Sequence, residues 1–288
     1  MDAIDRIERA LEVAVDEVAV SAPLRLVASV RHAVFPGGAR IRPRLCLAVA
    51  RACGEDRPAV TEAAASAIEL LHCASLVHDD LPCFDDAATR RGRASVHKAF
   101  GEAGAVLAGD ALIVLAFQVL AQGTASAPAR LPGLLTAISS AVGMPFGIVA
   151  GQAWEAEPRA DLDTYHRTKT ASLFATASAC GALAAGHQTG TWPLLGERLG
   201  EAYQVADDIR DVVCDADEIG KPIGQDAALG RCSAVEELGL DGAIRRLDRL
   251  IAEALAAIPA CPGQAELRDA MFVQAQRFVP RDLARRAA

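Results

Sequence analysis

Two short acidic clusters are the residues of this sequence best suited to chemistry. They read DDLPCFDD at residues 79–86 and DDIRD at residues 207–211. On a helix, the three carboxylates of the second cluster share one face and repel one another, so a cation is expected there. Carboxylates without a Cys or His ligand nearby suit Mg²⁺, which takes one or two carboxylates and completes its octahedron with water and phosphate oxygens. The two clusters therefore predict a magnesium-assisted site for a diphosphate, and the alternative is that each is a solvated acidic face.

Side chains that bind phosphate directly accompany both clusters. They are Arg40, Arg42, Arg90, Arg91, Lys169, Thr170 and Lys221. Guanidinium forks match the geometry of phosphate oxygens. Two competing motifs are missing from the sequence: Lys221 is followed by proline rather than by Ser or Thr, and GxSxG does not occur. The sequence thus favours a diphosphate site over a P-loop or a serine hydrolase.

The elements that must position these residues are predicted to be helices. Apolar residues recur at three- or four-residue steps between Gly and Pro breaks, and strand-like alternation is hard to find. The predicted helices lie near residues 3–20, 24–34, 41–53, 57–81, 93–99, 103–122, 130–142, 145–158, 161–186, 193–214, 226–238, 240–257 and 263–277. For the helix near 57–81, Asp56 is the expected cap and Pro82 ends the helix. We expect one all-α domain over residues 1–288, a helical bundle with a central apolar cavity.

The composition excludes several classes of protein. Among 288 residues, 29 Lys and Arg face 37 Asp and Glu, and aromatic residues make up 4%, so binding to nucleic acid is not expected. The eight cysteines include no CxxC pair, and no secretion signal is visible, so we expect a cytoplasmic location. The longest apolar run, residues 103–121, contains Asp110. It predicts a buried core helix rather than a membrane span, and hence no integral membrane protein.

Taken together, the motifs resemble those of the trans-isoprenyl diphosphate synthases. In chain order they are GGARIRP (37–43), HDDLPCFDD (78–86), RRG (90–92), GDAL (109–112), GQ (151–152), KT (169–170), QVADDIRD (204–211) and GKP (220–222). The resemblance covers nearly the whole chain and is greatest to bacterial members that make geranylgeranyl diphosphate for carotenoid and bacteriochlorophyll pathways. It implies an isoprenoid-synthase-type helical bundle that acts as a cytoplasmic homodimer.

The resemblance also implies a reaction and a role for each motif residue. The reaction is the head-to-tail condensation of isopentenyl diphosphate with an allylic diphosphate, assisted by Mg²⁺, about three ions per active site. The implied metal ligands are Asp79, Asp85, Asp207 and Asp211. The implied catalytic residues are Asp79, Asp80, Arg90, Lys169, Asp207, Asp208 and Lys221. The implied contacts of the allylic substrate are Arg90, Lys169, Thr170, Gln204 and Lys221, and those of isopentenyl diphosphate are Arg42, His72 and Arg91.

Product length is predicted from small residues before the first cluster. In the family, the residue five positions before the first aspartate forms a floor for the growing chain, and an aromatic there stops growth at farnesyl diphosphate. Here that residue is Ala74, with Ser75 beside it, and Leu71 is the expected floor one turn deeper. The missing ring leaves room for about one more isoprene unit, which favours geranylgeranyl diphosphate. The alternative is that Ala74 is simply a small core residue.

Other interpretations remain open. Ala39 replaces the lysine of the family's GGKR, which leaves Arg40, Arg42, His72 and Arg91 for isopentenyl diphosphate. That departure keeps a weakly active or regulatory homologue subunit as an alternative, beside a farnesyl diphosphate synthase. Terpene cyclases share the first motif, but their second usually contains Asn, Ser and Glu. Glu69-x-x-His72 matches half of a di-iron site and has no second copy, and His72 on an apolar face is also typical of a core histidine.

Overall fold

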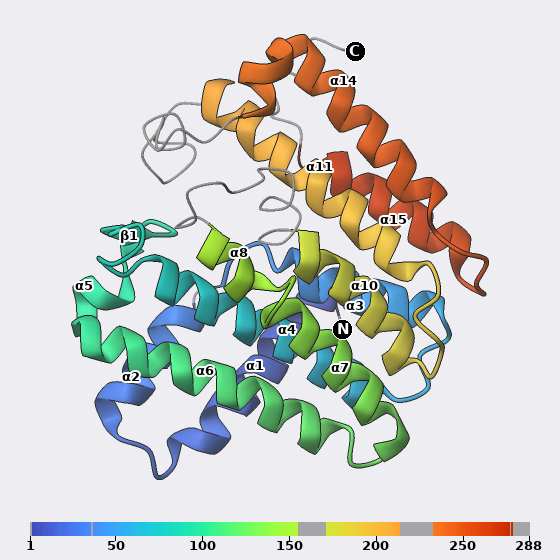
Figure 1. The fold of residues 1–288 in the computed structure, drawn as a ribbon. Helices are drawn as coiled ribbons and strands as arrows, with labels where there is room; N and C mark the ends of the chain where they lie inside the picture. Colours follow the sequence, from blue (N-terminus) through green and yellow to red (C-terminus); the bar gives the residue numbers. More distant parts are fainter. Residues whose placement is uncertain (1, 36, 155–170, 214–232, 277, 279–288) are drawn as a thin grey trace. The chain divides into compact units, whose positions relative to one another are not determined.

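The computed structural model of the chain describes residues 2–35, 37–154, 171–213, 233–276 and 278. These residues form helices almost throughout, together with one two-stranded hairpin (Figure 1). They belong to two compact units, Met1–Ile138 with Cys180–Gln188, and Ser139–Ala179 with Thr189–Ala288. The predicted all-α fold is confirmed, while the single domain over residues 1–288 stays a prediction.

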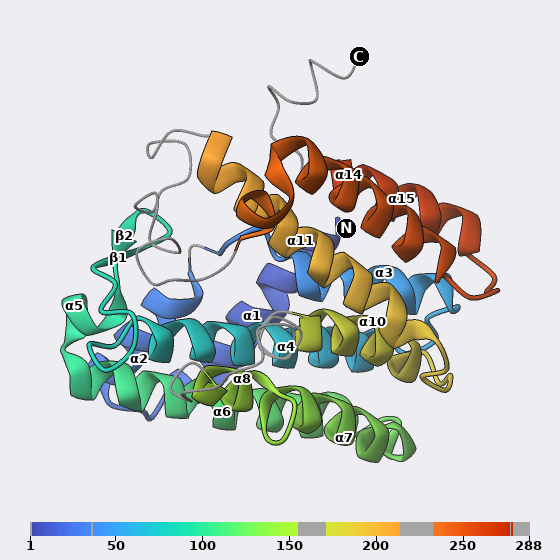
Figure 2. The ribbon, with the colours of Figure 1, turned by 45° about the horizontal axis from the view of Figure 1, so that its top comes forward.

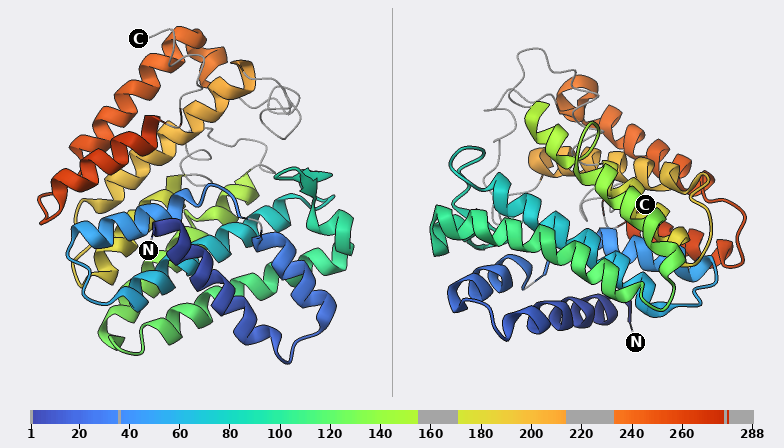
Figure 3. Two further views of the ribbon diagram at one scale, coloured as in Figure 1. Left: turned by 180° about the vertical axis from the view of Figure 1, so that it is seen from behind. Right: turned by 60° about the horizontal axis from the view of Figure 1, so that its bottom comes forward.

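The first unit contains the N-terminal helices and the first acidic cluster. Its elements are α1 (Ala3–Ala19), α2 (Leu24–Val34), α3 (Ile41–Ala52), α4 (Pro58–Asp79), β1 (Thr89–Arg90), β2 (Arg93–Ala94), α5 (Val96–Phe100), α6 (Glu102–Gly123), the 3₁₀ turn η1 (Pro128–Arg130) and most of α7 (Leu131–Val142). Helix α4 packs against α3 and α6, and α2 packs against α6 (Figures 1 and 3). The helix that ends in the first cluster is therefore the central helix of this unit.

Two glycines allow α4 and α6 to approach closely. A Cβ atom on Gly109 would lie 2.0 Å from Nε2 of His78, and one on Gly123 would lie 2.3 Å from Cβ of Ala63. The residue numbers rise along α6 as they fall along α4, so the two helices run antiparallel. Substitution at either glycine would push the helices apart, because interiors are packed without spare volume.

Two local predictions are wrong. The N-cap of α4 is Arg57, whose side chain makes no capping bond, and Asp56 instead accepts hydrogen bonds from Arg130 at 2.7 and 2.9 Å. Residues 93–94 form β2 rather than the beginning of a helix, because β1 and β2 pair across a turn at Arg91 and Gly92. Both central residues of that turn have positive φ, as a two-residue hairpin turn requires.

Two helices of the described chain, α4 and α6, are long and apolar enough to cross a membrane by length and composition alone. The most apolar window of α4 is 78% buried, as in the core helix of a soluble protein, but that of α6 is only 39% buried. The predicted core helix at 103–121 corresponds to α6, and only one face of this helix is buried. On the other face Val106, Leu107 and Val114 are exposed.

The second unit contains the helix of the second acidic cluster. Its elements are the end of α7, α8 (Ile148–Trp154), most of α10 (Ser172–Ala184), α11 (Trp192–Val213), α14 (Ala234–Ala256) and α15 (Gln264–Gln276). Helix α14 contacts both α11 and α15 (Figure 2). A Cβ on Gly196 would meet the Phe174 carbonyl oxygen at 2.1 Å, so α11 approaches α10 through a small-residue face. The predicted segments 145–158, 161–186 and 226–238 fall partly outside the described residues.

Candidate active site

The first acidic cluster begins at the end of α4. Asp79 is the last residue of the helix and Asp80 is its C-cap. Pro82 cannot continue the helix, and the chain turns back so that the Asp85 N–H donates to the Asp79 C=O at 3.0 Å. Asp86 lies apart: its carboxylate pairs with Lys98 at 3.0 Å, and this ion pair lowers the pKa of Asp86. The turn thus joins the two residues predicted to bind metal, Asp79 and Asp85, at the backbone.

Asp80 is held differently from Asp79. Its side chain is buried and accepts hydrogen bonds from Arg90 of β1, one of them from Nε at 3.0 Å. Burial raises the pKa of Asp80 above its ordinary value, and the Arg90 guanidinium offsets part of that rise. The ion pair fixes β1 to the end of α4. Arg90, predicted to contact the allylic substrate, therefore lies directly beside the first cluster.

The hairpin that carries Arg90 and Arg91 is attached to the end of α2. Arg93 donates to the Phe35 carbonyl at 2.8 Å and to Nδ1 of His32 at 3.0 Å. Since Nδ1 accepts, Nε2 of His32 carries the proton and donates to the Ala94 carbonyl at 2.7 Å. Arg91 has a φ of 53°, which costs on the order of 1 kcal/mol for a residue other than glycine. The turn thus stores backbone strain at a predicted binding residue.

The three residues predicted to contact isopentenyl diphosphate come together in the first unit. Arg42 donates from Nη1 to Nε2 of His72 at 3.3 Å. An arginine has no acceptor, so Nε2 accepts and the ring is neutral. Burial lowers the pKa of His72 well below its ordinary value, and the charges of Arg42 and Arg91 lower it further. A Cβ on Gly38 would lie 2.9 Å from Cζ of Arg91, so that guanidinium covers the loop before Arg42.

Arg40 is not available to this subsite, contrary to the expectation from the sequence. Its side chain is 1% exposed and donates to Glu69 at 2.6 Å and to Glu8 at 2.7 Å. Burial works to lower the pKa of Arg40, but the two carboxylates outweigh it and leave the pKa above its ordinary value. This ion cluster is not among the features predicted from the sequence. Glu69 could have indicated it, because a charged residue inside an apolar helix needs a partner when it is buried. Ala39, by contrast, is exposed.

The second acidic cluster lies in the last turns of α11. Asp207 accepts from Nη1 of Arg210 at 2.9 Å, and Arg210 also donates to the Phe278 carbonyl at 3.0 Å. Asp208 is buried and accepts from Nε2 of Gln204 at 3.1 Å and from the N–H of Ala234 at 2.8 Å. Ser233 is the N-cap of α14 and Ala234 its first residue, so Asp208 supplies a further acceptor at the N-terminus of that helix.

Several predicted residues add nothing to this geometry. Lys169, Thr170 and Lys221 lie outside the described residues. Asp211 is half-buried one turn after Asp207. Among the residues that the structure describes, no group of three or more His, Cys, Asp or Glu side chains is close enough to hold a metal ion alone. This donor set fits Mg²⁺, which binds through one or two carboxylates and takes its remaining ligands from water and phosphate.

The residues predicted to set product length lie in the interior of the first unit. Leu71 and Ala74 are each 2% exposed. Ser75 is half-buried and its hydroxyl donates to the His72 carbonyl at 2.9 Å. The prediction that they limit the chain stays a prediction.

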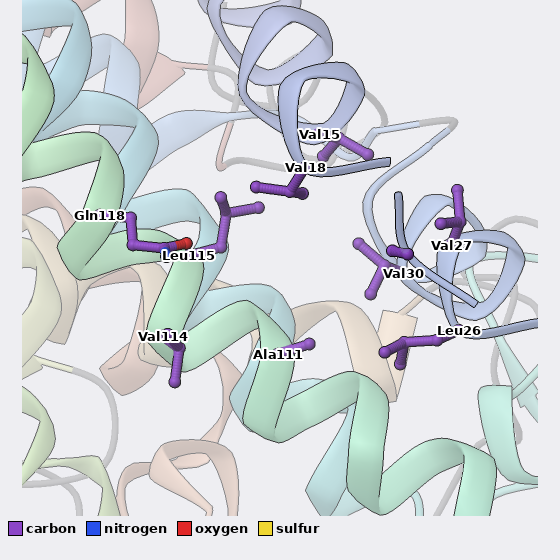
Figure 4. A pocket seen from close by; sticks show the side chains of 10 residues that line it. Val15, Val18, Leu26, Val27, Val30, Ala111, Val114, Leu115 and Gln118 are labelled. Atoms are coloured by element: carbon purple, nitrogen blue, oxygen red, sulfur yellow. The ribbon is translucent and has the colours of Figure 1, made fainter. Parts of the chain in front are cut away.

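A separate apolar cavity of about 200 Å³ opens between α1, α2 and α6 (Figure 4). Val15, Val30 and Leu115 point into it, and its one polar lining residue is Gln118. It includes no residue of either acidic cluster and none of the residues predicted to set product length. The cavity therefore lacks the groups that a diphosphate needs.

An all-α chain with two aspartate clusters at helix ends, one beside an arginine-rich subsite, has the features of a helical isoprenoid synthase. The sequence profile of the family described as polyprenyl synthetase matches residues 24–261. The chain is 52% identical over 282 residues to the geranylgeranyl diphosphate synthase of Cereibacter sphaeroides, with 98% of each chain covered. It is 49% identical to that of Rhodobacter capsulatus, with 95% of each covered. The chain belongs to the polyprenyl synthetase family.

Solved structures agree with this assignment. A geranyltransferase from Helicobacter pylori, complexed with magnesium and isoprenyl diphosphate, matches with a TM-score of 0.81 and 30% identity, covering 96% of both chains. The geranylgeranyl pyrophosphate synthetase of Pyrococcus horikoshii matches with a TM-score of 0.82 at 26% identity, covering 97% of this chain and 98% of that one. The predicted resemblance to bacterial geranylgeranyl diphosphate synthases is confirmed.

Proposed function

We propose that this protein is a geranylgeranyl diphosphate synthase, which condenses isopentenyl diphosphate with allylic diphosphates. The observation that carries the proposal is the 52% identity over nearly the whole chain to a bacterial enzyme of that name. The structural support is the subsite of Arg42, His72 and Arg91 beside the first acidic cluster. A prenyl condensation needs two diphosphates, and the chain offers a cationic and an acidic region for them.

Isopentenyl diphosphate binds at Arg42, His72 and Arg91. Arg42 and Arg91 supply guanidinium forks that match phosphate oxygens. His72 is neutral before substrate binds, and the arriving negative charge favours its protonated form. The subsite then gains a donor where the anion needs one. Exposed Ala39 adds no charge, so we expect weaker binding than in relatives with a lysine at that position.

The allylic diphosphate binds through the aspartates. We propose that Asp79, Asp85, Asp207 and Asp211 would hold Mg²⁺, about three ions per active site, whose charge would neutralise the departing diphosphate. Arg90, oriented by Asp80, donates to the same diphosphate, and Lys169, Thr170, Gln204 and Lys221 complete its contacts. These donors stabilise the charge that develops on the leaving group.

The remaining steps need an apolar enclosure. The allylic carbocation survives only where water is excluded. The double bond of isopentenyl diphosphate attacks it, and a proton leaves to the departing diphosphate. The chain grows toward Ala74 and Ser75, whose small side chains leave room for the fourth isoprene unit, until it meets Leu71.

A product assay tests the function. The protein is incubated with Mg²⁺, isopentenyl diphosphate and dimethylallyl, geranyl or farnesyl diphosphate in turn, and product length is read by chromatography. A geranylgeranyl product supports both the reaction and the floor at Leu71, whereas farnesyl diphosphate as the end product places the floor nearer to the first cluster. A lack of product from every allylic substrate contradicts the proposal.

A regulatory subunit is the second candidate, and Ala39 is the residue that favours it. Such a protein makes no product alone but changes the rate or product length of an active relative from the same cell. Mixing the two and repeating the assay separates this function from the first. The retention of both acidic clusters favours the enzyme.

We further propose that the protein is a homodimer. The exposed Val106, Leu107 and Val114 of α6 form an apolar face of a kind that usually contacts another protein. Leu107→Glu is expected to shift the mass measured by light scattering from two chains to one. A single-chain mass for the parent protein contradicts the proposal. The cytoplasmic location stays a prediction.

A further inference from the structure

Arg40 is the centre of a buried ion cluster that neither acidic motif explains. Its guanidinium donates from Nη1 to Glu69 at 2.6 Å, from Nε to Glu8 at 2.7 Å and from Nη2 to the Val34 carbonyl at 2.8 Å. Each of its three nitrogens therefore has an acceptor. Exposure is 1% for the Arg40 side chain and 3% for that of Glu69. A buried charge with this many bonds is costly to disturb.

The cluster fixes the loop that precedes Arg42. Arg40 has φ 49° and ψ 38°, a left-handed conformation that is unfavourable for a residue with a side chain, and it forms the N-cap of α3. A Cβ on Gly37 would lie 2.3 Å from the Arg40 guanidinium, so the loop folds directly over that group. Arg42 follows two residues later, in the first turn of α3. The anchored side chain of Arg40 thus determines where α3 begins and where Arg42 emerges.

The same cluster reaches the other half of the subsite through α4. Glu69 lies three residues before His72, so the two side chains share a face of the helix. Arg40 is bound to Glu69, and Arg42 is bound to His72 at 3.3 Å. Two parallel links therefore join the beginning of α3 to one face of α4. The third residue of the subsite, Arg91, lies against Gly38 of the same loop.

We propose that Arg40 is a positioning residue for isopentenyl diphosphate: its bonds to Glu69 and Glu8 hold the loop at residues 37–40 against α4, so that Arg42, His72 and Arg91 converge on one diphosphate. This inference rests on the proposed function and concerns how its isopentenyl diphosphate subsite is held in shape. Arg40 acts through its neighbours and does not touch substrate.

Two observations separate positioning from direct binding. The Arg40 side chain is closed off from solvent, so a diphosphate cannot reach it without unfolding the loop. Its positive charge is also outweighed, because the two carboxylates of Glu8 and Glu69 surround one guanidinium. Arg40 therefore adds no net positive charge that could attract an anion. In the sequence motif it nevertheless stands between positions 39 and 42, which the family resemblance assigns to isopentenyl diphosphate.

Arg40→Lys is the sharpest test. A lysine keeps the charge, but its ammonium cannot serve both carboxylates and the carbonyl in the planar geometry of a guanidinium. The KM for isopentenyl diphosphate is expected to rise on the order of tenfold, because small displacements of binding groups are costly. The KM for the allylic substrate and kcat are expected to stay within about threefold. Glu69→Gln, which keeps the shape of its partner, is expected to shift the same KM in the same direction by less.

Arg6→Lys is the matched control. Arg6 is also ion-paired with two glutamates, Glu55 at 2.9 and 3.2 Å and Glu62 at 2.9 Å, and it also ties α1 to α4 within the first unit. It has no link to the loop at 37–40. Arg6→Lys is expected to lower the melting temperature and to leave the KM for isopentenyl diphosphate at the parent value.

The outcomes are distinct. A KM for isopentenyl diphosphate that is unchanged in both Arg40→Lys and Glu69→Gln overturns the inference and leaves the proposed function intact. Equal increases in both KM values, or the same increase in Arg6→Lys, show a general loss of structure and also overturn it. A parent protein that makes no prenyl product contradicts the proposed function itself, and the inference falls with it. If Arg40→Lys does not fold, Glu69→Gln alone decides between these outcomes.

Discussion

The two acidic clusters share a layout but are held in place by different interactions. In each cluster the first aspartate, Asp79 or Asp207, is half-buried, while the second, Asp80 or Asp208, is buried. Asp80 is bonded to Arg90, a cation predicted to contact substrate. Asp208 is bonded to an amide side chain and to the first N–H of α14. The second aspartate therefore orients an arginine predicted to bind substrate in one unit, and accepts a backbone N–H at the beginning of a helix in the other.

Because of this difference, we expect the second aspartate to matter for activity in one cluster and for stability in the other. An ion pair with a partly exposed arginine contributes little to stability, because the arginine finds water when its partner is lost. A buried acceptor at a helix N-terminus contributes more, because its loss leaves an N–H without a partner. Loss of Asp80 should thus affect activity, and loss of Asp208 should affect the fold.

The largest expected effect concerns the first aspartate of each cluster. Asp79→Ala and Asp207→Ala should each lower kcat on the order of 10³-fold, because each removes a carboxylate proposed to hold Mg²⁺ beside the leaving group. Circular dichroism should show unchanged helix content. Asp56→Ala, which removes an exposed carboxylate before the other end of α4, is the control. Unchanged turnover of either variant in excess Mg²⁺ would remove the metal role of that cluster.

Substitutions of the second aspartates, Asp80 and Asp208, test whether the two clusters are held by different interactions. Asp208→Ala should lower the free energy of unfolding by about 1–3 kcal/mol, the cost of leaving the buried N–H of Ala234 without its acceptor. Asp80→Asn should change it by less than about 1 kcal/mol and reduce the rate instead. Urea titration and steady-state kinetics on both variants measure the two effects. Equal losses of stability in both variants would show that the clusters are held alike.

A third change uses the small residues of α4. Ala74→Phe should shorten the product to farnesyl diphosphate, because its ring takes up the room proposed for the fourth isoprene unit. Ala65→Phe places the same ring on the opposite, equally buried face of α4 and should destabilise without changing the product. Chromatography of the products distinguishes them. An unchanged product in Ala74→Phe would place the floor elsewhere.

The smallest expected effect is a dependence of stability on pH in the first unit. The folded pKa of His72 lies below its unfolded value, so the unfolded chain binds more protons once the pH falls below about 6.5. Stability is therefore lost as the pH falls from that value toward the folded pKa, by at most about 1.4 kcal/mol per pH unit. His72→Gln should flatten this dependence in urea titrations at several pH values. Parallel curves for the two proteins would show that His72 keeps an ordinary pKa.

Much of the fold could be predicted from the sequence, because alanine-rich helices with regular apolar spacing follow local rules. The helices near 3–20, 24–34 and 41–53 agree with α1, α2 and α3 to within a residue or so. The failures came where tertiary partners competed with local ones. Asp56 is a good helix cap by type, yet Arg130, far along the chain, binds its carboxylate.

The sequence predicts which residues belong to the candidate site, but not which of them are buried. Spacing identifies the aspartates and arginines, because metal and phosphate chemistry demands those types. Spacing does not reveal which members are buried, since Arg40 and Arg42 look alike in the sequence. Only the packed structure shows that Arg40 faces Glu8 and Glu69 while Arg42 faces His72. The shape of the loop, rather than its composition, separates the two arginines.

The strained turn at Arg91 has a consequence for protein engineering. Its positive φ favours glycine or asparagine, and replacing an unfavourable residue in such a turn commonly stabilises a protein. Selection for heat resistance alone should therefore enrich Arg91→Gly or Arg91→Asn, variants that melt later and bind isopentenyl diphosphate poorly. Libraries built on this chain need turnover as a second selection criterion, or position 91 must be held constant.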